Sequence, residues 1–244
     1  MTSKLTNAER FVNTYNRLDS YMRKEVKTDN YIGHSSLIDL MVNQGYSSVA
    51  RYTDILKQFA KLRNAIVHNP KDHESYSIAE PHDSIVQEYE NIYNQIKNPP
   101  LAIEHLAIPS GKIYTTSLDS NVLEVIDKMK KNHYTHVPIL ENDILVGVFS
   151  ENTIFSYVAE NHMILVENDT KIWEYSKFTP IHKHTNELFM FAHRGTTVFE
   201  IEDIFREQYK DNKRVESVFI TENGKENEKI LGLITPWDVA TYDD

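Results

Sequence analysis

Apolar residues recur every three or four positions along the first hundred residues, which is the spacing of one face of an α-helix. The pattern predicts four amphipathic helices. They span about residues 7–24, 35–44, 47–67 and 83–97. Because each predicted helix has one apolar stripe and the links are short, we expect an up-and-down bundle.

Polar residues at the ends of these stripes indicate where the helices begin and end. Thr6 and Glu9 have the spacing of a capping box, in which each side chain accepts a hydrogen bond from the other residue's backbone N–H. Asp83 is expected to cap the fourth helix. The third is expected to stop at His68, because Asn69 precedes a proline and is disfavoured in the α region.

From about residue 101 the pattern changes to strands that alternate with helices. One unit has a predicted helix capped by Ser120, two strands joined by a turn at Asn142 and Asp143, and a helix capped by Ser150. A similar unit follows at a constant offset of 85 residues, which places Gly232 where the first unit has Gly147.

The sequence thus predicts an α+β multidomain protein. An all-α four-helix bundle over residues 1–100 precedes two β-α repeats over residues 101–244. The boundary between the first repeat, 101–162, and the second, 163–244, is expected near residue 162.

Composition narrows the class of protein. The 244 residues include no cysteine, which excludes disulfides, thiolate zinc sites and a cysteine nucleophile. No apolar run is long enough to span a bilayer, and no signal peptide is recognised, so we expect a cytoplasmic protein without a membrane partner.

Charge is distributed unevenly along the chain. The net charge is −10, which disfavours nucleic acid over most of the surface, and we expect no DNA partner. Residues 51–73 differ, because five Lys or Arg against two Asp give +3. A solvated helix face with paired charges also produces such a segment, so the local excess favours a polyanion partner only modestly.

Arg63, Asn64 and His68 lie together at the predicted end of the third helix. RNA carries its own nucleophile, the 2′-hydroxyl, so its cleavage needs proton transfer and stabilisation of a negatively charged phosphorane. A histidine can transfer the proton and an arginine fork can hold phosphate oxygens, without a metal. The alternative is structural, with Arg63 as a helix-end charge and His68 as a C-terminal cap.

The segment from Arg63 to His68 resembles the R-x4–6-H signature of HEPN domains, and the helical context extends the resemblance over about residues 5–98. The resemblance implies a metal-independent endoribonuclease that leaves 2′,3′-cyclic phosphate ends. His68 would be the general acid or base, Arg63 the phosphate clamp and Asn64 an orienting group. It also implies a homodimer, in which two copies line one cleft.

The two β-α repeats resemble a tandem pair of CBS domains, a Bateman module, over about residues 102–244. The resemblance implies that Gly232, Thr235 and Asp238 bind an adenine nucleotide, whether AMP, ADP, ATP or a dinucleotide. Gly232 would let the ligand approach the backbone, and Asp238 would accept bonds from the ribose hydroxyls. Alternatively, Thr235 and Asp238 form only a capping box.

Two further segments of the repeats carry expectations about ligands. Thr179 and Ile181 resemble the strand entry that contacts the base through its backbone. The first repeat has Thr153 where the second has Asp238, so we expect one good nucleotide site and not two. His182 and His184 have the spacing of a metal pair, but without a third ligand we expect no metal and assign both to the exposed surface.

These observations support three hypotheses about function. The first is an endoribonuclease that an adenine nucleotide regulates through the repeats. The second is a non-catalytic nucleotide sensor whose helical domain mediates dimerisation or partner binding. The third is a protein that binds RNA without cleaving it.

Overall fold

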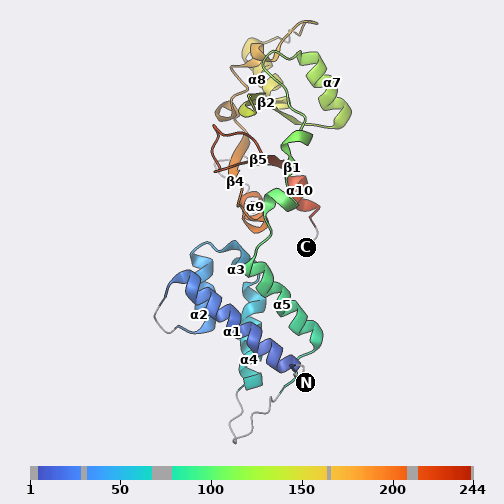
Figure 1. Cartoon of the computed structure of the whole chain (residues 1–244). Helices are drawn as coiled ribbons and strands as arrows, with labels where there is room; N and C mark the ends of the chain where they lie inside the picture. Colours follow the sequence, from blue (N-terminus) through green and yellow to red (C-terminus); the bar gives the residue numbers. More distant parts are fainter. Residues whose placement is uncertain (1–4, 29–31, 68–78, 164–165, 208–213, 243–244) are drawn as a thin grey trace, which may run out of the picture. The chain divides into compact units, whose positions relative to one another are not determined.

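The chain forms two compact units, Met1–Pro100 and Leu101–Asp244 (Figure 1). A computed structural model describes residues 5–28, 32–67, 79–163, 166–207 and 214–242. Within these ranges, no helix combines the length and the apolar character that crossing a bilayer requires.

Helices make up the first unit. Its described helices are α1 (Asn7–Val26), α2 (His34–Asn43), α3 (Ser47–Arg51), α4 (Thr53–Val67) and α5 (Asp83–Lys97). α1 packs against α2, α4 and α5. The rings of Phe11, Phe59 and Tyr89 meet in the core with centroids 4.7–5.5 Å apart. The predicted apolar stripes therefore converge on one core.

The predicted third helix is divided into α3 and α4. Tyr52, between them, has φ −105° and ψ 11°, and its N–H donates to the carbonyl of Val49 three residues earlier. The Thr53 hydroxyl donates to the carbonyls of Val49 and Ala50. Such side-chain bonds to the preceding turn compete with regular helix geometry. The first unit is therefore not a simple bundle of four helices.

The N-caps observed in the structure can be compared with the predicted ones. The capping box of Thr6 and Glu9 is confirmed. Asp83 is not the cap of α5, because His82 occupies that position and the Asp83 carboxylate pairs with Arg10 at 2.6 Å. Since α1 and α5 lie side by side, an ion pair between helices takes the side chain that the sequence assigned to a local bond.

The second unit contains both repeats. In chain order its elements are α6 (Ala102–His105), β1 (Ile108–Pro109), η1 (Ser110–Lys112), α7 (Val122–Asn132), β2 (His136–Glu141), β3 (Ile144–Ser150), α8 (Glu151–Asn161), η2 (Ile172–Tyr175), η3 (Ile181–Lys183), β4 (Glu187–His193), α9 (Val198–Arg206), β5 (Arg214–Thr221), β6 (Gly232–Ile234) and α10 (Pro236–Ala240). β2 and β3 form a hairpin, and β1, β6, β5 and β4 form a second sheet in that order.

Local signals in the repeats are mostly confirmed. Asn142 and Asp143 have φ values of 52° and 67°, as the turn of a tight hairpin requires. Ser150 caps α8. The cap of α7 is Asn121 and not Ser120, because the Asn121 side chain accepts from the backbone N–H of Glu124. Asn and Ser are comparable caps, which makes adjacent candidates hard to separate.

Each repeat exchanges its leading segment with the other repeat. β1 pairs antiparallel with β6, and Leu106 lies in the core that α9 and β5 build. In the opposite direction, the backbone N–H of Val148 donates to the carbonyl of Thr179 at 2.8 Å. Tyr175 packs into the core of α7 and β2. The division in space thus differs from the sequence boundary expected near residue 162.

Candidate functional site

Arg63 and Asn64 lie in the last turn of α4, and His68 lies outside the described residues. The Arg63 guanidinium carbon is 5.0 Å from the centre of the Tyr15 ring. Its Nη1 is 3.4 Å from Asn64 Oδ1. Its Nε is buried and has no hydrogen-bond partner among the described residues. The structure therefore brings two of the three residues of this predicted site together and presents Arg63 on an aromatic face.

Polar side chains from α1 and α2 surround that aromatic face. The His34 ring stacks on Tyr15 with centroids 4.1 Å apart. His34 Nδ1 lies 2.8 Å from Asp19 Oδ1, and Arg23 Nε donates to Oδ2 of the same carboxylate. Burial alone would raise the pKa of Asp19, but the hydrogen bonds from His34 and Arg23 lower it below its usual value. No sequence motif indicates this cluster, because 19 positions separate Tyr15 from His34 in the chain and short-range patterns do not connect them.

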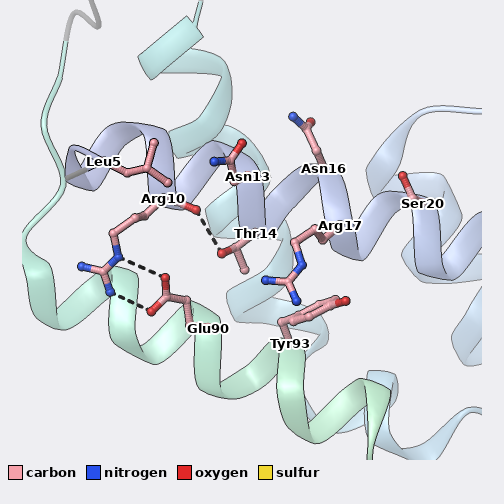
Figure 2. A pocket seen from close by; sticks show the side chains of 9 residues that line it. All are labelled: Leu5, Arg10, Asn13, Thr14, Asn16, Arg17, Ser20, Glu90 and Tyr93. Carbon is pink, nitrogen blue, oxygen red and sulfur yellow. Dashed lines mark hydrogen bonds and ion pairs between the residues drawn. The ribbon is translucent and has the colours of Figure 1, made fainter. Parts of the chain in front are cut away.

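A groove also runs along α1 and α5 of the helical unit (Figure 2). Its cations are already engaged. Arg10 donates to both oxygens of Glu90, at 3.1 and 2.7 Å. Arg17 lies 4.6 Å from the centre of the Tyr93 ring. These contacts connect the two helices, which gives the groove a structural role.

An open cleft lies in the second unit, with a volume of about 710 Å³. Residues of both repeats line it. They include Lys112, Tyr114, His133, Tyr134, His136, Arg214, Glu216, Leu233, Thr235 and Trp237. The cleft therefore joins the loop after β1, the start of β2, the start of β5 and the β6–α10 junction.

Thr235 and Asp238 form a capping box at the start of α10. The backbone N–H and the hydroxyl of Thr235 both lie 2.7 Å from Asp238 Oδ2. The structural alternative for this pair is thus present. It does not exclude a ligand role, because both bonds use Oδ2 and Thr235 also lines the cleft.

Gly232 lies where two strands approach each other closely. A Cβ at this position would lie 2.9 Å from Cβ of Ala107 and 3.2 Å from the carbonyl oxygen of Ile108. The approach of β1 to β6 therefore favours glycine here. The predicted approach of a ligand to Gly232 stays a prediction.

Thr179 and Ile181 lie beside the first repeat. A Cβ on Gly147 would be 2.6 Å from the Thr179 carbonyl oxygen, and η3 contacts β3. Thr235 lines the open cleft, and its neighbours in the chain, Gly232 and Asp238, are not among the lining residues. Thr179 and Ile181 do not line the cleft either. The five predicted nucleotide-binding residues are therefore divided between two places, because the leading segments cross between repeats.

Aromatic and charged residues that the sequence analysis missed surround the open cleft. Trp237 is 79% exposed, which is unusual for so large an apolar side chain. Tyr114 and Tyr134 stack with ring centroids 5.9 Å apart. Arg214 pairs with Glu216 through Nε at 2.8 Å. The sequence could have indicated Trp237, because this residue lies inside the motif that contains Thr235 and Asp238.

The family comparison locates the first repeat. Residues 104–160 match a CBS domain. This segment begins in α6 and ends in α8, so it contains the β2–β3 hairpin. A comparison with curated proteins gave no match.

Solved structures of CBS-domain proteins resemble part of the chain. CBSX2 in complex with AMP is 12% identical, with 57% of this chain and 92% of that chain covered and a TM-score of 0.40. CbpB in complex with c-di-AMP is 17% identical, with coverage of 56% and 80% and a TM-score of 0.39. A CBS domain protein from Streptococcus pneumoniae TIGR4 is 15% identical, with coverage of 65% and 89% and a TM-score of 0.41. The ligands named are those of these proteins.

The counterpart of the Thr235 region in the first repeat is filled by a side chain. At the offset of 85 residues, Ser150 corresponds to Thr235. The Ser150 hydroxyl donates to the carboxylate of Glu187 at 3.1 Å. His184 also contacts this carboxylate and is 5% exposed, so its assignment to the exposed surface was wrong. His182 is exposed, as expected.

Proposed function

We propose that the second unit binds an adenine nucleotide in the open cleft and acts as the sensor of this protein. The supporting observation is the position of the segment from Gly232 to Asp238, which matches the nucleotide motif of CBS domains and borders a cleft of about 710 Å³. That volume falls within the range of small-molecule sites. The CBS match of the first repeat supports the same assignment.

The cleft offers a partner for each part of a nucleotide. The exposed ring of Trp237 provides a face on which a base can stack. Lys112 and Arg214 provide positive charge for phosphate. Asp238 lies next to the lining residues Pro236 and Trp237 in the chain and holds Thr235 through Oδ2, which leaves its Oδ1 for a ribose hydroxyl. The ligand class is an adenine mononucleotide or dinucleotide.

Calorimetry with AMP, ATP and cyclic di-AMP tests this proposal. We expect binding of at least one ligand, and a loss of about tenfold or more in affinity for Asp238→Ala, because a charge-assisted hydrogen bond contributes about 1.5–3 kcal/mol. Titrations with ligand at a concentration far above the protein would detect weak binding. Absence of binding to all three would contradict the proposal.

A matched control separates ligand contact from helix capping. Thr197 and Glu200 form a capping box at α9 with the same two 2.7 Å distances as Thr235 and Asp238. Thr235 lines the cleft, whereas neither residue of the α9 capping box does. Glu200→Ala therefore removes a comparable cap, and we expect it to leave nucleotide affinity unchanged.

A second candidate function concerns the helical unit. We propose that it acts on RNA as a metal-independent endoribonuclease, regulated by the sensor and assembled as a homodimer. The observation that favours this function is Arg63, whose guanidinium lies on Tyr15 beside Asn64 and whose Nε has no partner among the described residues. The excess of positive charge over residues 51–73 also suits a phosphate chain.

Incubation of the purified protein with single-stranded RNA and EDTA, with and without AMP, tests this second function. Cleavage that leaves 2′,3′-cyclic phosphate ends and that His68→Ala abolishes would support it. Arg63→Ala should reduce the rate, whereas Arg17→Ala, which removes a similar arginine–tyrosine contact, should not. If the RNA is bound but intact, the unit binds RNA without cleaving it. If RNA is neither bound nor cut, the second unit remains a sensor for another partner.

A further inference from the structure

Glu187 is a buried carboxylate held entirely by polar side chains of the second unit. It is the first residue of β4 and is 5% exposed. Its Oε1 lies 2.9 Å from His136 Nε2 and 2.8 Å from Asn152 Nδ2. Its Oε2 accepts from the Ser150 hydroxyl at 3.1 Å and contacts His184 Nδ1. Four donors from three regions of the chain therefore surround one carboxylate.

His184 lies between two oxygen atoms. Nδ1 faces the Glu187 carboxylate, and Nε2 lies 3.2 Å from the carbonyl oxygen of Thr179. The His184 side chain is 2% exposed. The carboxylate is thus the partner of a buried imidazole nitrogen.

Two residues that hold this carboxylate correspond in sequence to two residues that line the open cleft. At the offset of 85 residues, Ser150 and Asn152 match Thr235 and Trp237. Thr235 and Trp237 line the open cleft, whereas Ser150 and Asn152 donate to Glu187. Ser150 is also the N-cap of α8, a helix of 11 residues whose N-terminus favours a negative charge.

We propose that Glu187 is an internal anion in the first repeat, where it occupies a place equivalent to that of a ligand in the second. The protein then binds one nucleotide per chain and carries a latent oxyanion site at the start of α8. The statement about the nucleotide rests on the proposed function of the open cleft. The latent site does not, because its four side chains are identified by their contacts with Glu187 alone.

Chemical rescue tests the latent site. Glu187→Ala removes the carboxylate, so two imidazole nitrogens, a hydroxyl and an amide lose the acceptor that Glu187 supplied. Acetate or inorganic phosphate should restore part of the lost interaction. We expect either anion, at the same ionic strength as chloride, to raise the midpoint of thermal unfolding of Glu187→Ala by roughly 2–4 °C more than that of the wild type.

Two variants make the rescue experiment specific. Glu228→Ala removes a carboxylate that binds Asn223 in an exposed loop, and we expect no anion effect there because water can replace the lost acceptor. Glu187→Gln keeps the shape and most of the folding, so it provides a folded variant if Glu187→Ala fails to fold. Its midpoint should also respond to anions more than that of the wild type, but less than that of Glu187→Ala.

The outcomes separate this proposal from the proposed function. Equal anion effects on the wild type and on both Glu187 variants would overturn the latent site. Two nucleotides bound per wild-type chain would overturn the internal-anion assignment. A wild-type chain that binds no nucleotide, together with anion rescue of Glu187→Ala, would reject the proposed function and leave the oxyanion site supported.

Discussion

The second unit contains two related places that differ in how their polar groups are satisfied. Beside α10, Thr235 and Asp238 satisfy each other and border an open cleft. Beside α8, Ser150 donates to Glu187, which comes from the other repeat. One of the two related places thus borders an open cleft, and a side chain of the protein itself occupies the other. The difference lies in a single strand start, since β4 brings Glu187 to α8.

The largest expected effect comes from removing the internal anion. Glu187→Ala should lower the free energy of unfolding by about 3–5 kcal/mol, because it removes the shared acceptor of four polar side chains that are buried or partly buried. Urea unfolding followed by circular dichroism measures this loss. Glu228→Ala should cause a much smaller change. Similar losses in the two variants would show that the buried contacts of Glu187 contribute no more to stability than those of a carboxylate in an exposed loop.

The next comparison concerns the two glycines at which the leading segment of one repeat packs against the other repeat. Gly147→Ala should destabilise by about 2–3 kcal/mol, because its Cβ would lie 2.6 Å from a backbone oxygen of Thr179. Gly232→Ala should cost about 1–2 kcal/mol, since its closest contact is the Ala107 methyl at 2.9 Å. Thermal unfolding of both variants ranks them. The reverse order would show that the second crossing is the more rigid.

Acid should reduce the stabilisation that the Glu187 carboxylate gives to the fold. Burial would raise the pKa of Glu187, but the hydrogen bonds from His136 and His184 hold it well below the ordinary value of 4.5. The stabilisation is therefore complete above about pH 4.5 and is lost as the pH falls below it. Glu187→Gln should therefore reduce the slope of the free energy of unfolding against pH by up to about 1.4 kcal/mol per pH unit. Urea midpoints at pH 5, 4 and 3 measure the slopes, and equal slopes for variant and wild type would contradict the assignment.

The smallest expected effect on stability belongs to the open cleft. Trp237→Ala should leave the free energy of unfolding within about 0.5 kcal/mol, because the side chain is 79% exposed. It should weaken AMP binding by about threefold to tenfold through loss of stacking. Calorimetry and urea unfolding on the same preparation separate the two effects. A large loss of stability with unchanged affinity would assign Trp237 to the fold.

Many elements follow from short stretches of sequence. The capping box of Thr6, the turn at Asn142 and the cap at Ser150 depend on residues within four positions of each other, and all three are confirmed. The periodic apolar stripes also located the helices of the first unit, although not the break at Tyr52. That break depends on a hydroxyl competing for backbone carbonyls, which a hydrophobic pattern does not register.

The candidate sites could be predicted from the sequence less completely than the helices and turns. The sequence placed Thr235 and Asp238 at the start of a helix, but grouped them with Thr179 and Ile181, which lie beside the first repeat. It assigned His184 to the surface, because no short-range pattern indicates that a carboxylate will bury it.

The sequence alone determined where most helices and turns begin, the presence of two repeats and the match of one repeat to the CBS domain. Only the tertiary structure decided which leading segment joins which repeat, and which of the two related places is open. The physical reason is distance along the chain. Caps and turns are set by neighbours within one turn of helix, whereas Glu187 reaches Ser150 across 37 residues, and its bond exists only after both repeats have packed.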